Sequence, residues 1–308
     1  MNQHIRTIAI LGAGAVGSYL VMGLSDKYKE NLWVIADGER KDRLAKNGLN
    51  INDKVYSLHI KTPAEAHGVD LLFVCTKYTQ LRDSLPDIET ITDKHTMVVS
   101  LLNGVDSEEL IGQRIGMEHM IYSLIRIASH RIGNSIHFSL PKGYNGIYIG
   151  IPNQPACQDP RLAAIAEIFA DTPVTLHLSD DILLDMWDKF GLNVSRNLPQ
   201  AILGVGIGVY DDSIYADAIM RRMRHEVVLV ANAKGIPLTD EFTAAKWLPS
   251  QRYSTLQDLD AHRHTEIDMF SGALIRMGKE VGVECPYNEM TYNLIKALEE
   301  KNDGKFDY

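Results

Sequence analysis

Cysteine is scarce in this chain of 308 residues, and the three cysteines that it has are widely separated. Neither a disulfide framework nor a cysteine-based metal site is therefore predicted, and we expect no metal at all. No segment approaches the roughly 20 consecutive apolar residues of a membrane-spanning helix. The first residues also lack the pattern of a cleavable signal. These absences favour a globular protein of a reducing compartment, and we expect a cytoplasmic one.

An excess of positive charge is missing as well. The formal net charge is −9 at pH 7, which argues against a nucleic-acid backbone or an anionic membrane as the main partner. A local basic pocket can still bind a small anion, and a small-molecule substrate is the expected partner. The length favours two domains, each large enough to bury a core of its own.

A strand, a glycine turn and a helix are predicted at the start of the chain. The apolar run at residues 7–11 leads into the turn Gly12-Ala13-Gly14-Ala15-Val16-Gly17, and periodic apolar residues follow. In dinucleotide-binding folds the first glycine makes the turn and the second lets the backbone approach the pyrophosphate. The third allows close helix–strand packing. We expect all six residues of this turn to contact a dinucleotide cofactor.

Asp37 ends a second apolar run, about 20 residues beyond Gly17, where an acid usually accepts hydrogen bonds from the adenosine ribose. A carboxylate at this place also repels a 2′-phosphate, which favours NAD over NADP. Three basic residues follow closely and either grip a phosphate or form a solvated helix face; they are Arg40, Lys41 and Arg43. NAD(P)H is the predicted cofactor, and NAD is its preferred form.

Two further buried strands are predicted at residues 70–76 and 97–102, because both are nearly continuous apolar runs typical of a parallel sheet. Ligands bind open α/β sheets at the carboxyl ends of the strands, where Lys77 and Asn103 lie. Both are candidate cofactor contacts. The alternative for each is a loop residue that contacts no ligand. The other elements expected here are a hairpin at 49–60 and sheet strands at 120–127, 136–140 and 146–151.

The pattern becomes helical from about residue 179 onward. Helices are expected at residues 219–234 and 267–281, because each run is followed by glycine and then proline, which stop a helix. The sequence therefore predicts an α/β fold in two domains. A Rossmann dinucleotide-binding domain is expected at 1–178, and an all-helical substrate domain is expected at 179–308.

A polar stripe is predicted on a helix at residues 187–197. Lys189, Asn193 and Asn197 follow one another at steps of four, so their side chains share one helix face. A core helix carries apolar side chains at such positions. This stripe is therefore either a solvated surface or the wall of a polar site.

Thr265 and the acids that follow it resemble the capped start of a helix. Glu266 is then explained by its position near the positive end of a helix dipole, without any further function. A catalytic role for Glu266 is the alternative, and the local pattern does not decide between the two.

Four motifs in this order resemble those of ketopantoate reductases, a family within the 6-phosphogluconate dehydrogenase-like superfamily. They are GAGAVG at 12–17, LLNG at 101–104, WDKFGLNVSRN at 187–197 and STLQDLDAHRHTEID at 254–268. The resemblance extends over essentially the whole chain. It implies a homodimeric enzyme of pantothenate biosynthesis that transfers a hydride from NAD(P)H to a 2-keto acid and forms a D-2-hydroxy acid.

The resemblance also implies a role for each candidate residue. Lys189 matches the general acid, and Glu266 matches the carboxylate that orients this lysine and contacts the substrate. Burial between two domains is expected to lower the pKa of the lysine. The residues that match substrate-binding positions are Asn193, Asn197 and Ser254, with Asp258 in support. Lys77 and Asn103 match positions near the nicotinamide.

Two departures from the family pattern bear on the cofactor and the substrate. An arginine that commonly follows the second strand in NADP-using members is absent from Asp37-Gly38-Glu39, which favours NAD. Ile207 stands where a further substrate-binding asparagine is expected, which suits an apolar substrate group. Ketopantoate is the leading substrate, and the alternative is an NAD-dependent D-2-hydroxy acid dehydrogenase of the mandelate type. A non-enzymatic dinucleotide-binding regulator is disfavoured, because Lys189 and Glu266 are both present.

Overall fold

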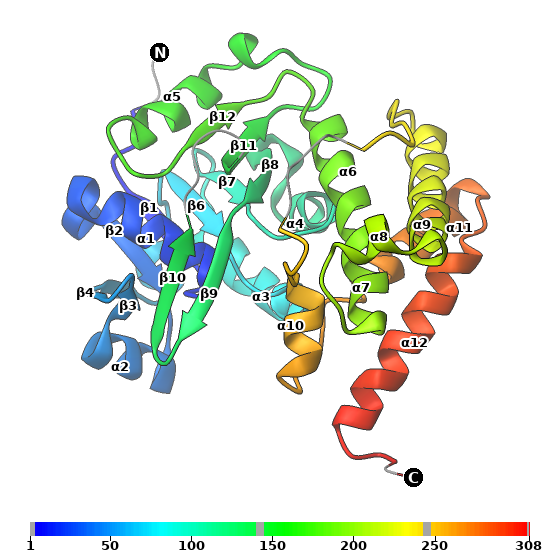
Figure 1. Cartoon of the computed structure of the whole chain (residues 1–308). Coiled ribbons are helices and arrows are strands. Elements are labelled where there is room, and N and C mark those ends of the chain that lie inside the picture. Colours follow the sequence, from blue (N-terminus) through cyan, green and yellow to red (C-terminus); the bar gives the residue numbers. More distant parts are fainter. Residues whose placement is uncertain (1–3, 140–144, 243–247, 307) are drawn as a thin grey trace. The chain divides into compact units, whose positions relative to one another are not determined.

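The computed structural model describes residues 4–139, 145–242, 248–306 and 308 (Figure 1). Its contacts divide the chain into two compact units, Met1–Ile182 and Leu183–Tyr308, called unit 1 and unit 2 below. Within the described residues, the strands belong to unit 1, and unit 2 consists of helices and their connections. The predicted fold class, a Rossmann-type α/β part followed by a helical part, is confirmed.

The main sheet of unit 1 has eight strands in the order β12-β11-β8-β7-β6-β1-β2-β5. Their bounds are β1 (Ile8–Leu11), β2 (Leu32–Ile35), β5 (His59–Lys61), β6 (Leu71–Val74), β7 (Met97–Ser100), β8 (Met120–Arg126), β11 (Gly146–Gly150) and β12 (Leu176–Leu178). The strands from β5 to β8 in this order run parallel, whereas β11 runs antiparallel to β8. The chain leaves β1 toward β2 and returns on its other side at β6. Ligands of such sheets bind at this reversal of strand order.

Helices cover both faces of the main sheet. They are α1 (Ala15–Tyr28), α2 (Gly38–Asn47), α3 (Tyr78–Ile91), α4 (Ser107–Ile115) and α5 (Pro160–Phe169), with short 3₁₀ turns at Lys29–Asn31, Ala64–Ala66, Met117–His119 and Ala156–Gln158. Ile8 and Ile10 of β1 belong to a core that also contains residues of α1 and α5. Ala9 and Leu11 belong to a second core with residues of α3 and α4. Both faces of β1 are therefore buried, which explains its uninterrupted apolar sequence.

A second, four-stranded sheet in unit 1 has the order β4-β3-β10-β9. Its strands are β3 (Leu49–Ile51), β4 (Lys54–Tyr56), β9 (Ala128–Ile132) and β10 (Ser135–Ser139). The predicted hairpin is confirmed over residues 49–56, with Asn52 and Asp53 at φ 48° and 63° in its turn, but its predicted end is wrong, because His59–Lys61 pairs with β2. The prediction that residues 136–140 extend the main sheet is wrong, because β10 pairs with β9 and β3. Phe138 of β10 packs on Tyr19 of α1 instead, and Leu140 lies outside the described residues.

Unit 2 is built around α9. Its helices are α6 (Ile182–Leu192), α7 (Leu198–Leu203), α8 (Val209–Asp212), α9 (Ile214–Ala233), α10 (Ser254–Asp260), α11 (Ser271–Val281) and α12 (Pro286–Asn302). Met223, Val227 and Val230 of α9 are fully buried. None of the helices in the described ranges combines the length and apolar character needed to cross a bilayer.

The predicted helix ends in unit 2 are close to the observed ones, but both starts are wrong. α9 begins at Ile214 rather than at residue 219. α11 ends at Val281, and Gly282 follows in the left-handed conformation at φ 74°. Its first residue is Ser271 rather than a residue at 265–267. Hydrogen-bonded turns occupy the stretch before it, where the carbonyl of Glu266 accepts from the backbone of Met269 at 3.0 Å and Phe270 at 3.3 Å.

Candidate functional site

The glycine turn between β1 and α1 has the geometry of a pyrophosphate cradle. A Cβ on Gly17 would lie 2.0 Å from the carbonyl oxygen of Gly12, so only glycine allows this approach of helix to strand. A Cβ on Gly14 would meet open space, and Gly14 is the residue before the first turn of α1. No side chain caps this helix end, so its backbone N–H groups and dipole are directed at a site for an anion.

Strand register brings the predicted cofactor contacts of unit 1 to the same edge of the sheet. Leu11 of β1 lies opposite Val74 of β6, which lies opposite Ser100 of β7. The glycine turn, Lys77 and Asn103 follow these three strand ends within a few residues. Lys77 is exposed at the start of α3, and Asn103 is half-buried in a bend. Their individual contacts with a nicotinamide stay a prediction.

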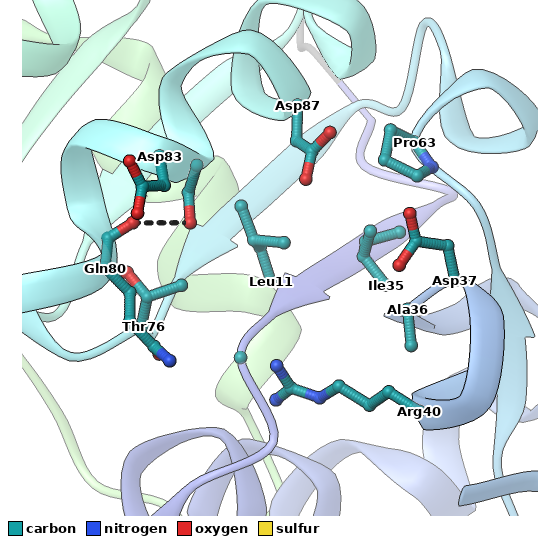
Figure 2. A pocket seen from close by; sticks show the side chains of 12 residues that line it. Leu11, Ile35, Ala36, Asp37, Arg40, Pro63, Thr76, Gln80, Asp83 and Asp87 are labelled. Atoms are coloured by element: carbon teal, nitrogen blue, oxygen red, sulfur yellow. Dashed lines mark hydrogen bonds between the residues drawn. The ribbon is translucent and has the colours of Figure 1, made fainter. Parts of the chain in front are cut away.

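A pocket of about 230 Å³ lies beside the glycine turn, at the ends of β1 and β2 (Figure 2). Figure 2 shows the carboxylates of Asp37 and Asp87 directed toward the pocket from α2's start and from α3. Asp83 also lines the pocket, and Arg40 brings a guanidinium to it. Burial, and then the negative charge of Asp37, raise the pKa of Asp87. Negative charge therefore dominates the place where an adenosine ribose is expected.

Of the three basic residues that follow Asp37, the structure places one at this pocket. Arg40 is among the lining residues, whereas the ammonium of Lys41 donates to the carboxylate of Glu65 at 3.2 Å. Arg43 is exposed and is not part of the lining. The alternative that all three basic residues bind a phosphate is therefore not supported. Arg40 alone of the three lines the pocket, together with three acids.

The polar stripe of unit 2 is continuous across a change of helix type. α6 carries Lys189 and gives way to a π-helical segment, Asn193–Asn197, before α7 begins. The side-chain amide of Asn197 donates to the carboxamide oxygen of Asn193 at 3.0 Å, so these two side chains do share a face. Lys189 and Asn193 are half-buried, and Asn197 is 6% exposed. Single π turns inside α-helices are frequent at functional sites.

Gln200 connects this stripe to the segment that carries Ser254, and the sequence did not single it out. Gln200 is fully buried, its amide donates to the carbonyl of Gln251 at 2.8 Å, and its oxygen accepts from the backbone of Tyr253 at 2.9 Å. Ser254, the first residue of α10, is exposed. Gln200 thus fixes the distance between α7 and the start of α10. The only local signal was a polar residue within an otherwise apolar helix.

Asp258 and Glu266 have different surroundings. The carboxylate of Asp258 accepts from the guanidinium of Arg263 at 2.8 Å, and its carbonyl accepts from the backbone of Arg263 at 2.8 Å. Asp258 is thereby engaged in closing the turn after α10, which fits a supporting role. Glu266 is half-buried in the turns before α11. Because no helix starts there, a helix dipole does not account for its position.

Arg224 is a second residue that the sequence did not reveal. It is 1% exposed on α9, and its guanidinium donates to the carboxylate of Asp188 at 3.0 Å and to its carbonyl at 3.3 Å. Two further carbonyls, of Thr239 and Glu241, accept from it. Asp188 precedes Lys189 on α6, so this buried ion pair holds the helix that carries the lysine.

Ile207 has little surface to offer a ligand. It is 4% exposed and packs in a small apolar cluster with Tyr210, Ala216 and Met220. Its backbone N–H donates to the carbonyl of Gln251 at 3.0 Å. A direct contact between Ile207 and a substrate stays a prediction. Across residues 4–139, 145–242 and 248–306, no group of three His, Cys, Asp or Glu residues is placed to hold a metal.

Comparison with known proteins identifies relatives of the whole chain. The family described as ketopantoate reductase PanE/ApbA matches residues 8–154, and its C-terminal part matches residues 181–299. A 2-dehydropantoate 2-reductase of Streptococcus pyogenes is 27% identical, with 95% of this chain and 97% of the relative aligned. The enzyme of that name from Pyrococcus horikoshii is 28% identical over 96% and 99% of the two chains.

Solved structures show the same fold over the same length. A D-mandelate dehydrogenase, in a ternary structure with NADH and anilino(oxo)acetate, superposes with a TM-score of 0.82 at 26% identity. The match covers 96% of this chain and 99% of that one. The two family matches account for most of the sequence, and they include the glycine turn and the polar stripe. The chain belongs to the ketopantoate reductase family.

Proposed function

We propose that this protein is an NAD(H)-dependent oxidoreductase that reduces a 2-keto acid to a D-2-hydroxy acid, with ketopantoate as the leading substrate. The observation that carries the proposal is the stripe of Lys189, Asn193 and Asn197. Its two carboxamides are hydrogen-bonded to each other at 3.0 Å, and the spacing of four residues puts Lys189 on the same helix face. Burial of a carboxamide is costly unless the group is hydrogen-bonded, and Asn197 is 6% exposed, so this stripe is not a simple solvated surface.

The nicotinamide, when bound, supplies a hydride to the carbonyl carbon of the keto acid. Negative charge then develops on the carbonyl oxygen, and a proton must reach it. Lys189 is the proposed donor of this proton, and Glu266 is proposed to orient the ammonium. Asn193, Asn197 and Ser254 provide hydrogen-bond donors for the substrate's carboxylate and hydroxyl, with Asp258 supporting Ser254 from within α10.

The preference for NAD over NADP rests on the pocket beside the glycine turn. A 2′-phosphate carries about two negative charges and would lie beside the carboxylates of Asp37, Asp83 and Asp87. These three acids outnumber the one guanidinium at the pocket, that of Arg40. The 2′-hydroxyl of NAD can instead donate a hydrogen bond to Asp37. Electrostatic repulsion is thus the proposed reason for choosing NAD.

A second candidate function is a D-2-hydroxy acid dehydrogenase of the mandelate type. The likeness to the NADH-bound D-mandelate dehydrogenase supports it, as does the acidic pocket. Under this alternative the cofactor chemistry and the roles of Lys189 and Glu266 are the same. The two functions differ only in the substrate's side chain.

One panel of assays tests both functions. NADH and NADPH oxidation would be followed with ketopantoate, 2-ketoisovalerate and phenylglyoxylate, with the Lys189→Ala variant as the control for background oxidation. Highest kcat/KM with ketopantoate and NADH supports the leading proposal. Activity on ketopantoate about tenfold or more below the other acids replaces it with the mandelate-type function. Binding of NADH without its oxidation in the presence of any of the three keto acids points to a regulator instead.

The family resemblance further implies a homodimer, which we include in the proposal. Light scattering of the purified protein at several concentrations measures the molar mass directly. A mass near twice 34.5 kDa supports the dimer, and a mass near 34.5 kDa contradicts it.

A further inference from the structure

One face of α12 is directed at the segment that carries Glu266. Tyr292, Lys296 and Glu299 are spaced by four and three residues, so they form a single stripe along the helix. Each of the three side chains hydrogen-bonds within this stripe or to Thr265 or Asp268. These two residues lie on either side of Glu266 in the sequence.

The contact on the N-terminal side of Glu266 is buried. One carboxylate oxygen of Glu299 accepts from both the backbone N–H and the hydroxyl of Thr265, each at 2.7 Å. Glu299 is 3% exposed and Thr265 is 2% exposed. The hydroxyl of Thr265 also accepts from the backbone N–H of Ile267 at 3.2 Å, so this bond links the two residues that flank Glu266. A charge-assisted hydrogen bond in a buried site that excludes water is stronger than a hydrogen bond between neutral groups.

The contact on the C-terminal side uses the other residues of the stripe. Asp268 accepts from the hydroxyl of Tyr292 at 2.7 Å and from the ammonium of Lys296 at 2.8 Å. Lys296 also donates to the second oxygen of Glu299 at 3.3 Å, which joins the two contacts into one network. Burial opposes ionisation of Asp268, but the hydrogen bonds from Lys296 and Tyr292 outweigh it, and the pKa of Asp268 is lowered.

We propose that Glu299, with Lys296 and Tyr292, is a positioning residue for Glu266. The backbone of Glu266 is restrained before it by Thr265, after it by Asp268, and at its own carbonyl by Met269 and Phe270. Only side-chain torsions remain to place its carboxylate. Such restraint is what an orienting group needs, because a displacement of about 1 Å at a reacting centre can lower the rate about 100-fold. This inference rests on the proposed role of Glu266 in the reaction.

A variant series separates positioning from simple structural support. Glu299→Ala removes both bonds to Thr265, and kcat is expected to fall about tenfold or more while NADH affinity is unchanged. Glu299→Gln retains an acceptor oxygen for Thr265 and is expected to recover most of the rate. Glu300→Ala is the matched control, because it removes the next carboxylate on α12, which bonds to Lys305. It is expected to leave kcat unchanged.

Combination with Glu266→Gln provides the decisive measurement. If Glu299 acts through Glu266, Glu299→Ala will lower kcat in the wild-type background and have no further effect in the Glu266→Gln background. An equal loss in both backgrounds overturns the positioning role, as does a kcat that stays at the wild-type value in folded Glu299→Ala. Wild-type turnover by Glu266→Gln would instead refute the proposed role of Glu266, and the positioning role with it.

Two milder variants apply if Glu299→Ala does not fold. Thr265→Val removes the hydroxyl from the first contact, and Tyr292→Phe removes the hydroxyl from the second. Each is expected to lower kcat about threefold to tenfold, consistent with one lost hydrogen bond. Both losses should disappear in the Glu266→Gln background. Unchanged kcat in both variants overturns the proposal.

Discussion

The side-chain amide of Asn197 donates a hydrogen bond of 3.0 Å to the carboxamide oxygen of Asn193 within a π-helical segment. The bond occupies the oxygen of Asn193 and directs the amide group of this residue away from Asn197. An amide group so oriented presents N–H donors, which suit an anionic ligand. The pair is therefore better arranged to bind a carboxylate than a cation.

Loss of either asparagine is expected to weaken substrate binding more than turnover. Asn193→Ala removes a donor to a charged group, so KM for the keto acid should rise about tenfold while kcat changes less. Steady-state kinetics at saturating NADH measure both constants. Asn293→Ala, which removes an exposed carboxamide on α12, is the control. An unchanged KM in Asn193→Ala would remove this residue from the substrate site.

The two asparagines should also behave as a coupled pair. Because each orients the other, the double variant Asn193→Ala/Asn197→Ala is expected to raise KM by less than the product of the single effects. A double-mutant cycle on KM measures this coupling. Strictly multiplicative effects would show that the 3.0 Å bond has no role in binding.

Lys189→Ala tests the proposed proton donor. Removal of a general acid is expected to lower kcat about 100-fold or more. NADH affinity, measured by fluorescence titration, should be nearly unchanged, because the glycine turn belongs to unit 1. Lys279→Ala, at an exposed position of α11, is the matched control and should retain full activity. Near-wild-type turnover in Lys189→Ala would exclude this lysine from proton transfer.

Asp37→Arg is expected to shift the cofactor preference toward NADPH, and the structure predicts that this single change is incomplete. Asp87 faces the same pocket and would still repel a 2′-phosphate. The double variant Asp37→Arg/Asp87→Asn should therefore raise the NADPH-to-NADH ratio of kcat/KM about tenfold above the single variant. Asp42→Asn on the exposed part of α2 is the control. Equal ratios in the single and double variants would show that Asp87 does not face the phosphate.

Much of the fold could be predicted from the sequence, because a strand that is buried on both faces of a sheet has a continuous apolar sequence. The run at residues 71–75 is apolar throughout, and β6 within it is completely buried. β12, with three residues and an exposed end, has no such signal and was not predicted. The residues at 136–139 were correctly expected to be extended, but their pairing with β9 and β3, and the contact of Phe138 with Tyr19, are tertiary features.

The candidate site was less accessible to sequence reasoning. Steps of four indicated that Lys189, Asn193 and Asn197 share a face, yet the same spacing fits an α-helix and the observed π-helical turn. The supporting residues have partners far along the chain, and no local pattern reports them. Gln200 bonds to residue 251, and Glu299 bonds to residue 265. Such polar residues look like ordinary members of a helix until the tertiary contacts are known.

Glu108, in the first turn of α4, makes a prediction about the pH dependence of stability. It is 1% exposed, and burial raises its pKa from 4.5 to about 8, against the hydrogen bond that the Ser107 hydroxyl donates to it at 2.8 Å. Below pH 4.5 the folded and unfolded states both hold the proton, and Glu108 has no effect on the balance. Between pH 4.5 and 8 the unfolded state loses the proton first, so stability falls as the pH rises.

Glu108→Gln keeps the neutral form at every pH and should abolish this loss. The variant is expected to match the wild type near pH 4.5 and to unfold ~3 °C or more above it at pH 9. Thermal unfolding by circular dichroism across this range measures the difference. Glu109→Gln, at the next and exposed position of α4, should follow the wild-type curve. A constant difference between Glu108→Gln and the wild type at all pH values would mean that the folded protein does not hold this proton, because only a titrating group makes the difference grow with pH.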